Sequence, residues 1–141
     1  MIGYFDTSAL VKLFVLEQGS KEADAIASRV DALATSVVAY AEARASFARL
    51  LREGLTTARK HRERVAKLNQ DWEKYVRVEL TPALARSSGE TAEAYGLRGF
   101  DSIHLAAALS LRDRIQIPLV FAVFDQRLRS AALSAGLEVL P

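Results

Sequence analysis

The chain has 141 residues, of which 50% are hydrophobic and 26% are charged, and its formal net charge is +2. This length and balance fit one soluble globular domain, residues 1–141, with a sizeable core. Because the chain has no cysteine, it has neither disulfides nor thiolate metal sites. Its uncharged runs reach only about half of the ~20 residues of a membrane-spanning helix, and its first residues do not form a signal peptide. We therefore expect a cytoplasmic protein that does not insert into a membrane.

Short apolar runs alternate with helical patterns along the whole chain. Strands are predicted at residues 2–5, 32–35, 76–80, 118–124 and 137–140. Helices are predicted at residues 9–18, 20–30, 37–53, 57–75, 82–95, 101–109 and 126–135. Their caps are expected to be Thr7 or Ser8, Ser36, Thr56 or Thr57, and Thr81 followed by Pro82. This alternation predicts an α/β/α sandwich around a mainly parallel sheet.

A Gly-containing loop leads to Asp101, which begins a helix that is apolar almost all the way round. Such a helix is buried in a core rather than lying on a surface. An acid at its start has two interpretations. It is either an N-cap that accepts backbone N–H groups, or a ligand whose charge a metal or substrate neutralises. The choice depends on whether other carboxylates converge on it.

Four carboxylates each stand alone in a mostly apolar or small-residue segment. They are Asp6, Glu42, Asp101 and Asp125. Asp6 and Asp125 follow predicted strands, and ligands of open parallel sheets bind beyond the carboxyl ends of the strands. Asp6 and Asp125, like Asp101, can alternatively be simple N-caps.

Glu42 is harder to explain as a surface residue. The positions three and four residues away carry Val38, Ala39, Ala45 and Ser46, so no basic side chain pairs with it locally. A carboxylate in such surroundings stays protonated, finds a distant partner or binds a cation.

Four carboxylates at one edge of a sheet would repel one another without a counter-ion. A set of oxygen ligands favours Mg²⁺, or Mn²⁺, over zinc. Such an ion polarises a phosphodiester and lowers the pKa of a bound water molecule. The predicted chemistry is therefore metal-dependent hydrolysis of a phosphodiester.

The chain resembles PIN-domain nucleases, and most closely the VapC-type toxins of toxin–antitoxin pairs. The matching pieces are Tyr-Phe-Asp-Thr-Ser-Ala-Leu-Val-Lys-Leu-Phe (4–14), Ala-Glu-Ala-Arg-Ala (41–45), Leu-Arg-Gly-Phe-Asp-Ser-Ile-His-Leu-Ala-Ala-Ala-Leu (97–109) and Phe-Asp-Gln-Arg-Leu (124–128). The resemblance implies a PIN-like fold and a Mg²⁺-dependent endoribonuclease whose acidic site consists of Asp6, Glu42, Asp101 and Asp125. It also implies an RNA substrate, a homodimer and a cognate VapB-like antitoxin that inserts a peptide near the acids.

One position departs from the family pattern. Members usually carry Thr or Ser two residues before the last Asp, whereas this chain has Val123. We therefore expect Asp125 to lack the hydroxyl support that the family pattern provides at this end of the site. Thr7 and Ser8 still offer hydroxyls beside the first Asp, and we assign them to orientation and capping.

Several other polar residues have two interpretations. His104 lies one turn after Asp101, and we interpret it as a residue that packs against its neighbours rather than as a metal ligand. The basic face of the helix at residues 57–75 is either solvated or in contact with an RNA backbone. Trp72 and Tyr75 on that helix are expected in the core or a dimer contact. The candidate RNA-binding residues are Arg44, Arg49 and Arg52.

Two alternative functions were weighed. The first is a catalytically weakened PIN fold that binds RNA or protein without cleavage, an alternative that Val123 keeps open. The second is a phosphatase of the haloacid-dehalogenase type, which needs a second Asp two residues after the first. That position is Ser8, so we set the phosphatase aside.

Overall fold

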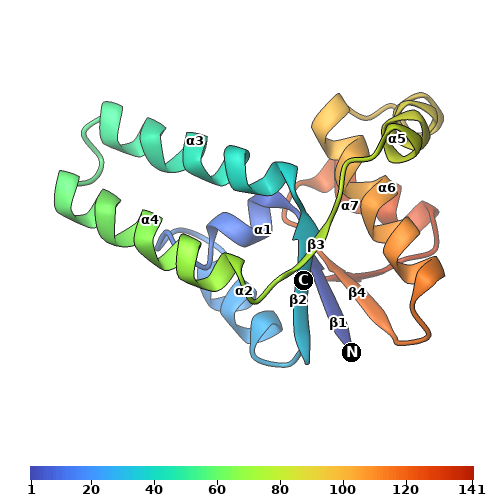
Figure 1. Cartoon of the computed structure of the whole chain (residues 1–141), viewed down its shortest axis with the longest axis horizontal. Helices are drawn as coiled ribbons and strands as arrows, with labels where there is room; N and C mark the ends of the chain where they lie inside the picture. Colours follow the sequence, from blue (N-terminus) through green and yellow to red (C-terminus); the bar gives the residue numbers. More distant parts are fainter.

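A computed structural model of residues 1–141 contains one five-stranded sheet in which every neighbouring pair is parallel (Figure 1). The strands are β1 (Ile2–Phe5), β2 (Ala32–Ser36), β3 (Val76–Val78), β4 (Leu119–Ala122) and β5 (Glu138–Leu140). The helices are α1 (Thr7–Val11), α2 (Ser20–Ala27), α3 (Val38–Arg52), α4 (Ala58–Trp72), α5 (Pro82–Tyr95), α6 (Gly99–Arg114) and α7 (Gln126–Ser134). None of these helices is both long and apolar enough to span a bilayer.

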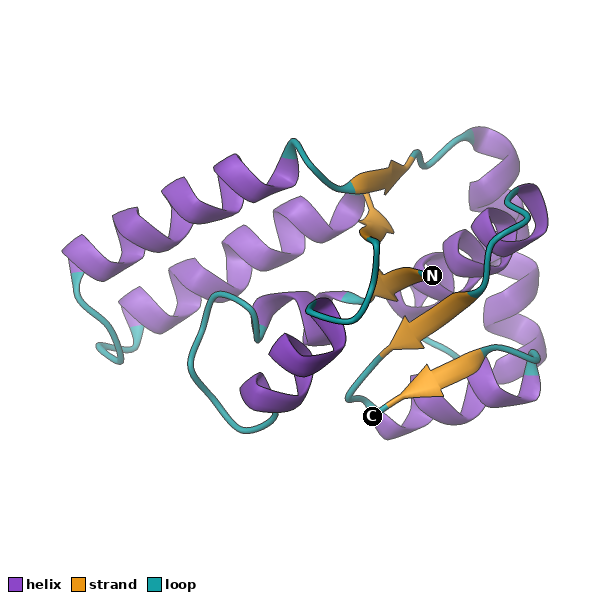
Figure 2. Cartoon of the chain, turned by 90° about the horizontal axis from the view of Figure 1, so that it is seen from below, coloured by secondary structure: helices purple, strands orange, loops and turns teal.

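The strand order is β3-β2-β1-β4-β5, so the first strand lies at the centre. Ile2 pairs with Ala32 of β2 on one side and with Leu119 of β4 on the other. The direction of winding reverses between β1 and β4, which places helices on both faces of the sheet (Figure 2). The predicted α/β/α sandwich is confirmed, and its sheet is entirely parallel.

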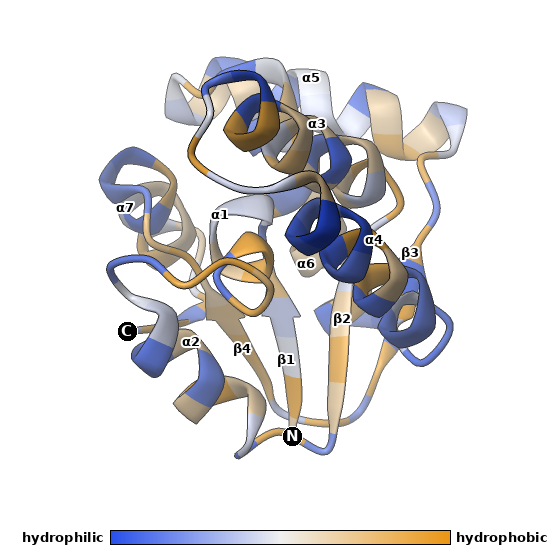
Figure 3. Ribbon diagram, turned by 90° about the vertical axis from the view of Figure 1, so that its left-hand side faces the viewer, coloured by the Kyte–Doolittle hydropathy of each residue, from blue (hydrophilic) through white to orange (hydrophobic).

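Alternate residues of each strand point to opposite faces of the sheet, and each face has its own core. Tyr4 and Phe121 lie in the larger core, which α5, α6 and α7 complete. Phe5 and Ala122 lie in a smaller core on the other face with residues of α1, α2 and α3. Figure 3 shows the apolar strands running up toward α1, α3 and α6 at their carboxyl ends. This end of the sheet receives the candidate site.

The α3–α4 hairpin projects beyond the edge of the sheet (Figure 1). A third apolar cluster holds it together and contains Val11 of α1, Phe47 of α3 and Leu68 of α4. Trp72 and Tyr75 are partly buried against the second core. Their predicted place in the core is confirmed, and they form no exposed surface for stacking bases.

The largest error in the predicted elements is at α1. The helix ends at Val11 and does not continue to Gly19. Beyond it the chain turns so that Val15 is buried against the hairpin, and the Ser20 hydroxyl donates to the Val15 carbonyl at 2.8 Å. Gly19 has a φ of 90° and begins α2 as its N-cap rather than closing α1. α2 itself ends at Ala27, a turn earlier than predicted.

The predicted caps of two later helices are confirmed. The Thr57 hydroxyl accepts from the Lys60 N–H, and the Thr81 hydroxyl accepts from the Leu84 N–H. The predicted cap of α3, Ser36, is wrong, because Val37 is the N-cap of this helix. The Ser36 hydroxyl still accepts from the Val38 N–H at 3.3 Å.

Candidate active site

The two central strands deliver two of the four predicted acids to the same edge of the sheet. Asp6 follows β1 directly, and Asp125 comes three residues after the end of β4. The Asp6 N–H donates to the Ala122 carbonyl at 3.2 Å, which continues the pairing of the two strands. This edge is where the winding of the sheet reverses, the usual position of a ligand site in open parallel sheets.

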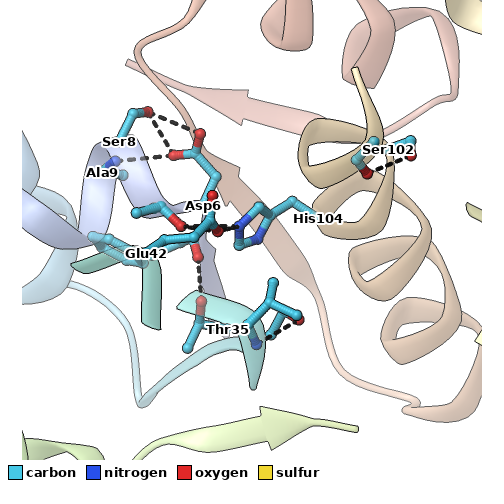
Figure 4. Close-up of polar contacts among 12 residues, drawn as sticks. Asp6, Ser8, Ala9, Thr35, Glu42, Ser102 and His104 are labelled. Atoms are coloured by element: carbon cyan, nitrogen blue, oxygen red, sulfur yellow. Dashed lines mark hydrogen bonds and ion pairs between the residues drawn. The ribbon is translucent and has the colours of Figure 1, made fainter. Parts of the chain in front are cut away.

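Asp6 is almost fully buried and is the N-cap of α1. Its Oδ1 accepts from the Ala9 N–H at 2.9 Å, and the Ser8 hydroxyl donates to both carboxylate oxygens at 2.7 and 2.8 Å (Figure 4). Neither Thr7 nor Ser8 caps the helix, so that prediction is wrong. Burial raises the pKa of the Asp6 carboxyl, although His104 and the Ser8 hydrogen bond act in the opposite direction.

Glu42 lies in the second turn of α3, and its side chain is 26% exposed. The Thr7 hydroxyl donates to its Oε1 at 2.6 Å, and His104 Nε2 lies 2.9 Å from the same oxygen. Burial by itself would raise the pKa of Glu42, but the hydrogen bonds with His104 and Thr7 outweigh it and lower that pKa. Of the three alternatives for this residue, the structure therefore shows a distant partner.

His104 is the site residue whose connection the sequence did not reveal. Its side chain is 2% exposed, and it reaches from α6 across the end of β1 toward Glu42 (Figure 4). Nδ1 lies 3.1 Å from the Tyr4 hydroxyl, and Nε2 also lies 3.0 Å from the Thr7 hydroxyl. The prediction that His104 packs against its neighbours agrees with its burial, but it did not include these polar contacts. The available signal was one imidazole in an otherwise apolar helical segment.

Asp101 lies within the first turn of α6, whose N-cap is Arg98. Of its two interpretations, the one as an N-cap is wrong, because the helix begins two residues earlier at Gly99. A carboxylate in the first turn is still favoured by the helix dipole. Burial raises the pKa of the Asp101 carboxyl, and the negative charges of Asp125 and Glu42 raise it further, against the effect of Arg98.

Asp125 is the N-cap of α7 and accepts from the Leu128 N–H at 2.8 Å. The capping role considered for it is confirmed. Val123 is 1% exposed and belongs to the larger core together with Leu128. No hydroxyl from position 123 therefore supports this acid.

The four acids influence one another, and two of them face the same space. Glu42 and Asp101 line a hollow of about 380 Å³ with Arg98, Gly99 and Phe100. The charge of Asp101 also raises the pKa of Asp6. No three acidic or histidine side chains stand close enough together to form a ready-made metal cluster. The donor atoms that these side chains offer are carboxylate oxygens, which are the ligands that hard divalent cations take.

The three arginines of α3 differ in their relation to this site. Arg49 lines a second hollow, of about 360 Å³, together with Thr7 and Ser8, and its guanidinium pairs with Glu53 at 2.8 Å. Arg44 is exposed and donates to the Tyr40 hydroxyl. Arg52 is exposed at the end of the helix. Of the three, Arg49 is the one that shares a hollow with residues beside Asp6.

Comparison with known proteins identifies relatives along the whole chain. The chain is 40% identical over 142 residues to Ribonuclease VapC45 and to Ribonuclease VapC49, both from Mycobacterium tuberculosis. Each alignment covers 98% of this chain and 94% of the relative.

Solved structures share the fold at lower identity. FitAcB from Neisseria gonorrhoeae superposes with a TM-score of 0.67 at 18% identity, over 100% of this chain and 97% of that one. VapC20 from Mycobacterium tuberculosis, described as a Sarcin-Ricin loop cleaving toxin, gives a TM-score of 0.67 at 19% identity over 99% of both chains. The family model of the PIN domain matches residues 3–133. The chain therefore belongs to the PIN-domain family.

Proposed function

We propose that the protein is a metal-dependent endoribonuclease that hydrolyses RNA phosphodiester bonds, with residues 1–141 acting as one PIN domain. The observation that carries this proposal is the gathering of acids at the carboxyl edge of the sheet. Asp6 and Asp125 follow adjacent strands, while Glu42 and Asp101 face one hollow. The two relatives that are 40% identical are named ribonucleases, which supports RNA as the substrate.

In this proposal the four acids Asp6, Glu42, Asp101 and Asp125 would hold Mg²⁺ or Mn²⁺, directly or through its bound waters. The bound ion supplies Lewis-acid polarisation of the phosphodiester and acidification of water. Ser8 keeps the Asp6 carboxylate in one orientation by donating to both of its oxygens. Thr7 orients Glu42 by donating to its Oε1 alone. Arg49 would contact an RNA phosphate in the hollow that it lines together with Thr7 and Ser8.

We further propose that the enzyme is the toxin of a type II toxin–antitoxin pair and acts in the cytoplasm as a homodimer. Structural neighbours include a toxin–antitoxin complex from Klebsiella pneumoniae and VapBC2 from Rickettsia felis bound to a promoter DNA fragment. A VapB-like antitoxin that presents a cationic side chain would neutralise the acids and silence the enzyme.

A PIN fold that binds RNA without cleaving it is the second candidate. The observation that favours it is Val123, which leaves Asp125 with only its helix-capping bond. In that case metal would not be needed for binding, and cleavage would be absent.

Cleavage of RNA by the purified protein separates the two candidates. We expect cleavage in Mg²⁺, none in EDTA, and at least a roughly 100-fold loss for Asp101→Asn, because losing the ion removes several kcal/mol of charge stabilisation. Asp113→Asn is the matched control, since Asp113 is an exposed acid on the same helix that pairs with Arg112. Cleavage that persists in EDTA or in Asp101→Asn would exclude the proposed mechanism.

A further inference from the structure

We propose that His104 is a positioning residue that fixes Glu42 for metal binding, and that Tyr4 sets the protonated nitrogen of its ring. This inference rests on the proposed function and adds two residues to it. It is based on a continuous chain of polar contacts that runs from the core of the sheet to the acidic hollow. The three side chains come from β1, α3 and α6, so the chain of contacts joins both faces of the sheet.

The imidazole of His104 is a buried polar group whose two nitrogens both have partners. Its neighbours in α6, Leu105 and Ala107, are fully buried apolar residues. Burying a polar ring in such surroundings costs free energy unless it is hydrogen-bonded. A residue needed only for packing would be served by leucine, without that cost. The bonds to Tyr4 and Glu42 satisfy the ring on both sides.

The Tyr4 hydroxyl determines which nitrogen carries the proton. A tyrosine hydroxyl has an ordinary pKa of about 10, so it carries its hydrogen at neutral pH. Nε2 of His104 faces two acceptors, the Glu42 carboxylate and the oxygen of Thr7, whose hydrogen is already donated to Glu42. Nδ1 is therefore the nitrogen that accepts from the Tyr4 O–H, at 3.1 Å. The second nitrogen, Nε2, is then the N–H that donates to Glu42. Tyr4 is itself held in place by stacking on Phe121, with ring centroids 5.4 Å apart.

The two donors to Glu42 act on one oxygen only. Thr7 and His104 both bond to Oε1, at 2.6 and 2.9 Å. No protein hydrogen bond reaches Oε2. The carboxylate is therefore held by one oxygen, while its charge and its second oxygen remain available to the hollow that it shares with Asp101. Partners of this kind orient a ligand before the ion arrives.

The test compares His104→Leu with His104→Gln. Leucine fills the buried space without a donor, whereas the glutamine amide can place an N–H near the position of Nε2. Mn²⁺ alone is titrated into each variant by calorimetry. We expect leucine to weaken Mn²⁺ binding by about 10–100-fold, the usual effect of removing such a partner, and glutamine to restore most of the affinity. The cleavage defect of His104→Leu should shrink as Mn²⁺ is raised.

Ser102→Ala is the matched control. Ser102 is as buried as His104 and lies on the same helix, but its hydroxyl donates to the Gly99 carbonyl of that helix (Figure 4). Its replacement should leave Mn²⁺ affinity unchanged. Tyr4→Phe removes a single hydroxyl and should lower Mn²⁺ affinity several-fold. In ¹H–¹⁵N spectra of the imidazole, the wild type should show a protonated Nε2 and Tyr4→Phe a mixture of tautomers.

The outcomes distinguish the positioning role from the proposed function. If the wild type binds Mn²⁺ and folded His104→Leu binds it equally well, the positioning role is wrong and the nuclease proposal stands. If the wild type itself binds no Mn²⁺, the metal-dependent mechanism fails, and the positioning role fails with it. If His104→Leu does not fold, Tyr4→Phe and the wild-type imidazole spectrum provide the test. Unchanged Mn²⁺ affinity in Tyr4→Phe, together with a protonated Nδ1 in the wild type, would overturn the inference.

Discussion

The acidic site has two sides that differ in how much of the protein supports them. We call Asp6 and Glu42 the supported side, and Asp101 and Asp125 the open side. Each carboxylate of the supported side receives hydrogen bonds from at least two groups of the protein. On the open side, Asp101 has only an Arg98 guanidinium 3.8 Å away, and Asp125 has only its helix-capping bond.

This difference has an electrostatic consequence. At Glu42, hydrogen bonds overcome burial and lower the pKa. At Asp101, which accepts no hydrogen bond from the protein, burial and the charges of neighbouring acids raise the pKa. Asp6 combines the two cases, because its hydrogen bonds hold it in place although burial still raises its pKa. The protein itself therefore arranges the supported side, whereas the charged forms of Asp6 and Asp101 are favoured only when a cation neutralises them.

The contrast between the two sides predicts that Glu42→Gln reduces RNA cleavage much more than Asp125→Asn does. Glutamine keeps the shape of Glu42 but removes its charge, so we expect RNA cleavage to fall at least roughly 100-fold, equivalent to several kcal/mol of metal-supplied stabilisation. Asp125→Asn keeps the helix cap, and its loss should be about tenfold or less. Initial rates at saturating Mg²⁺ measure both. Equal losses would mean that Asp125 contributes as much to cleavage as Glu42, although it has only its capping bond.

The second prediction concerns Thr7. Its hydroxyl makes the shortest bond to Glu42, at 2.6 Å. Thr7→Val has nearly the same shape but removes the hydroxyl, and with it both the bond to Glu42 and the 3.0 Å contact with His104 Nε2. We therefore expect about a 10–100-fold decrease in Mg²⁺ affinity or activity. Thr7→Ser, which restores the hydroxyl, is its control and should recover most of the loss. Full activity in Thr7→Val would show that Glu42 needs no fixed orientation.

Most of the fold follows from local patterns in the sequence. The apolar runs at β1 and β4 and the caps Thr57 and Thr81 are determined within a few residues, and all are found in the structure. The position at which α1 ends is not determined by residues near it in the sequence. The chain leaves the helix after Val11 because Val15 is buried in a cluster with Phe47 and Leu68 of the hairpin, residues that lie far from it in the sequence.

The gathering of the candidate acids was predictable in part. Isolation in apolar surroundings singles out the four acids, and the parallel sheet brings Asp6 and Asp125 to one edge; their role as one site stays a prediction. The connection between Glu42 and His104 spans 62 residues and depends on how α3 and α6 lie across the ends of the strands. No spacing rule within one element reveals such a contact. The position of Asp101 was missed because the helix start moved to Gly99, a shift of two residues.

Val123→Thr tests whether a hydroxyl at position 123 is enough to support Asp125 on the open side. Position 123 is 1% exposed within the larger core. A hydroxyl buried there without a partner should lower the free energy of unfolding by about 1–3 kcal/mol. We expect this loss in chemical denaturation and only a few-fold change in cleavage. A stable variant with markedly faster cleavage would show instead that the hydroxyl reaches Asp125 and that the open side can be supported.

The smallest predicted effect is a change in the pH dependence of stability in Asp6→Asn. Because folding raises the pKa of Asp6, ionising this group costs more in the folded chain than in the unfolded chain. The metal-free wild type therefore loses stability as the pH rises from the unfolded pKa through the folded pKa. Asparagine still accepts the capping bond but carries no charge, so this loss disappears.

Thermal unfolding in EDTA measures the effect. We expect Asp6→Asn to unfold a few degrees above the wild type at neutral pH and to match it in acid, where the wild-type carboxyl is protonated. Asp113→Asn, at an exposed position, should follow the wild type throughout. Excess Mg²⁺ should stabilise the wild type and not Asp6→Asn. A variant less stable than the wild type at neutral pH would mean that the charge of Asp6 strengthens its bonds to Ser8 and Ala9 by more than burial costs.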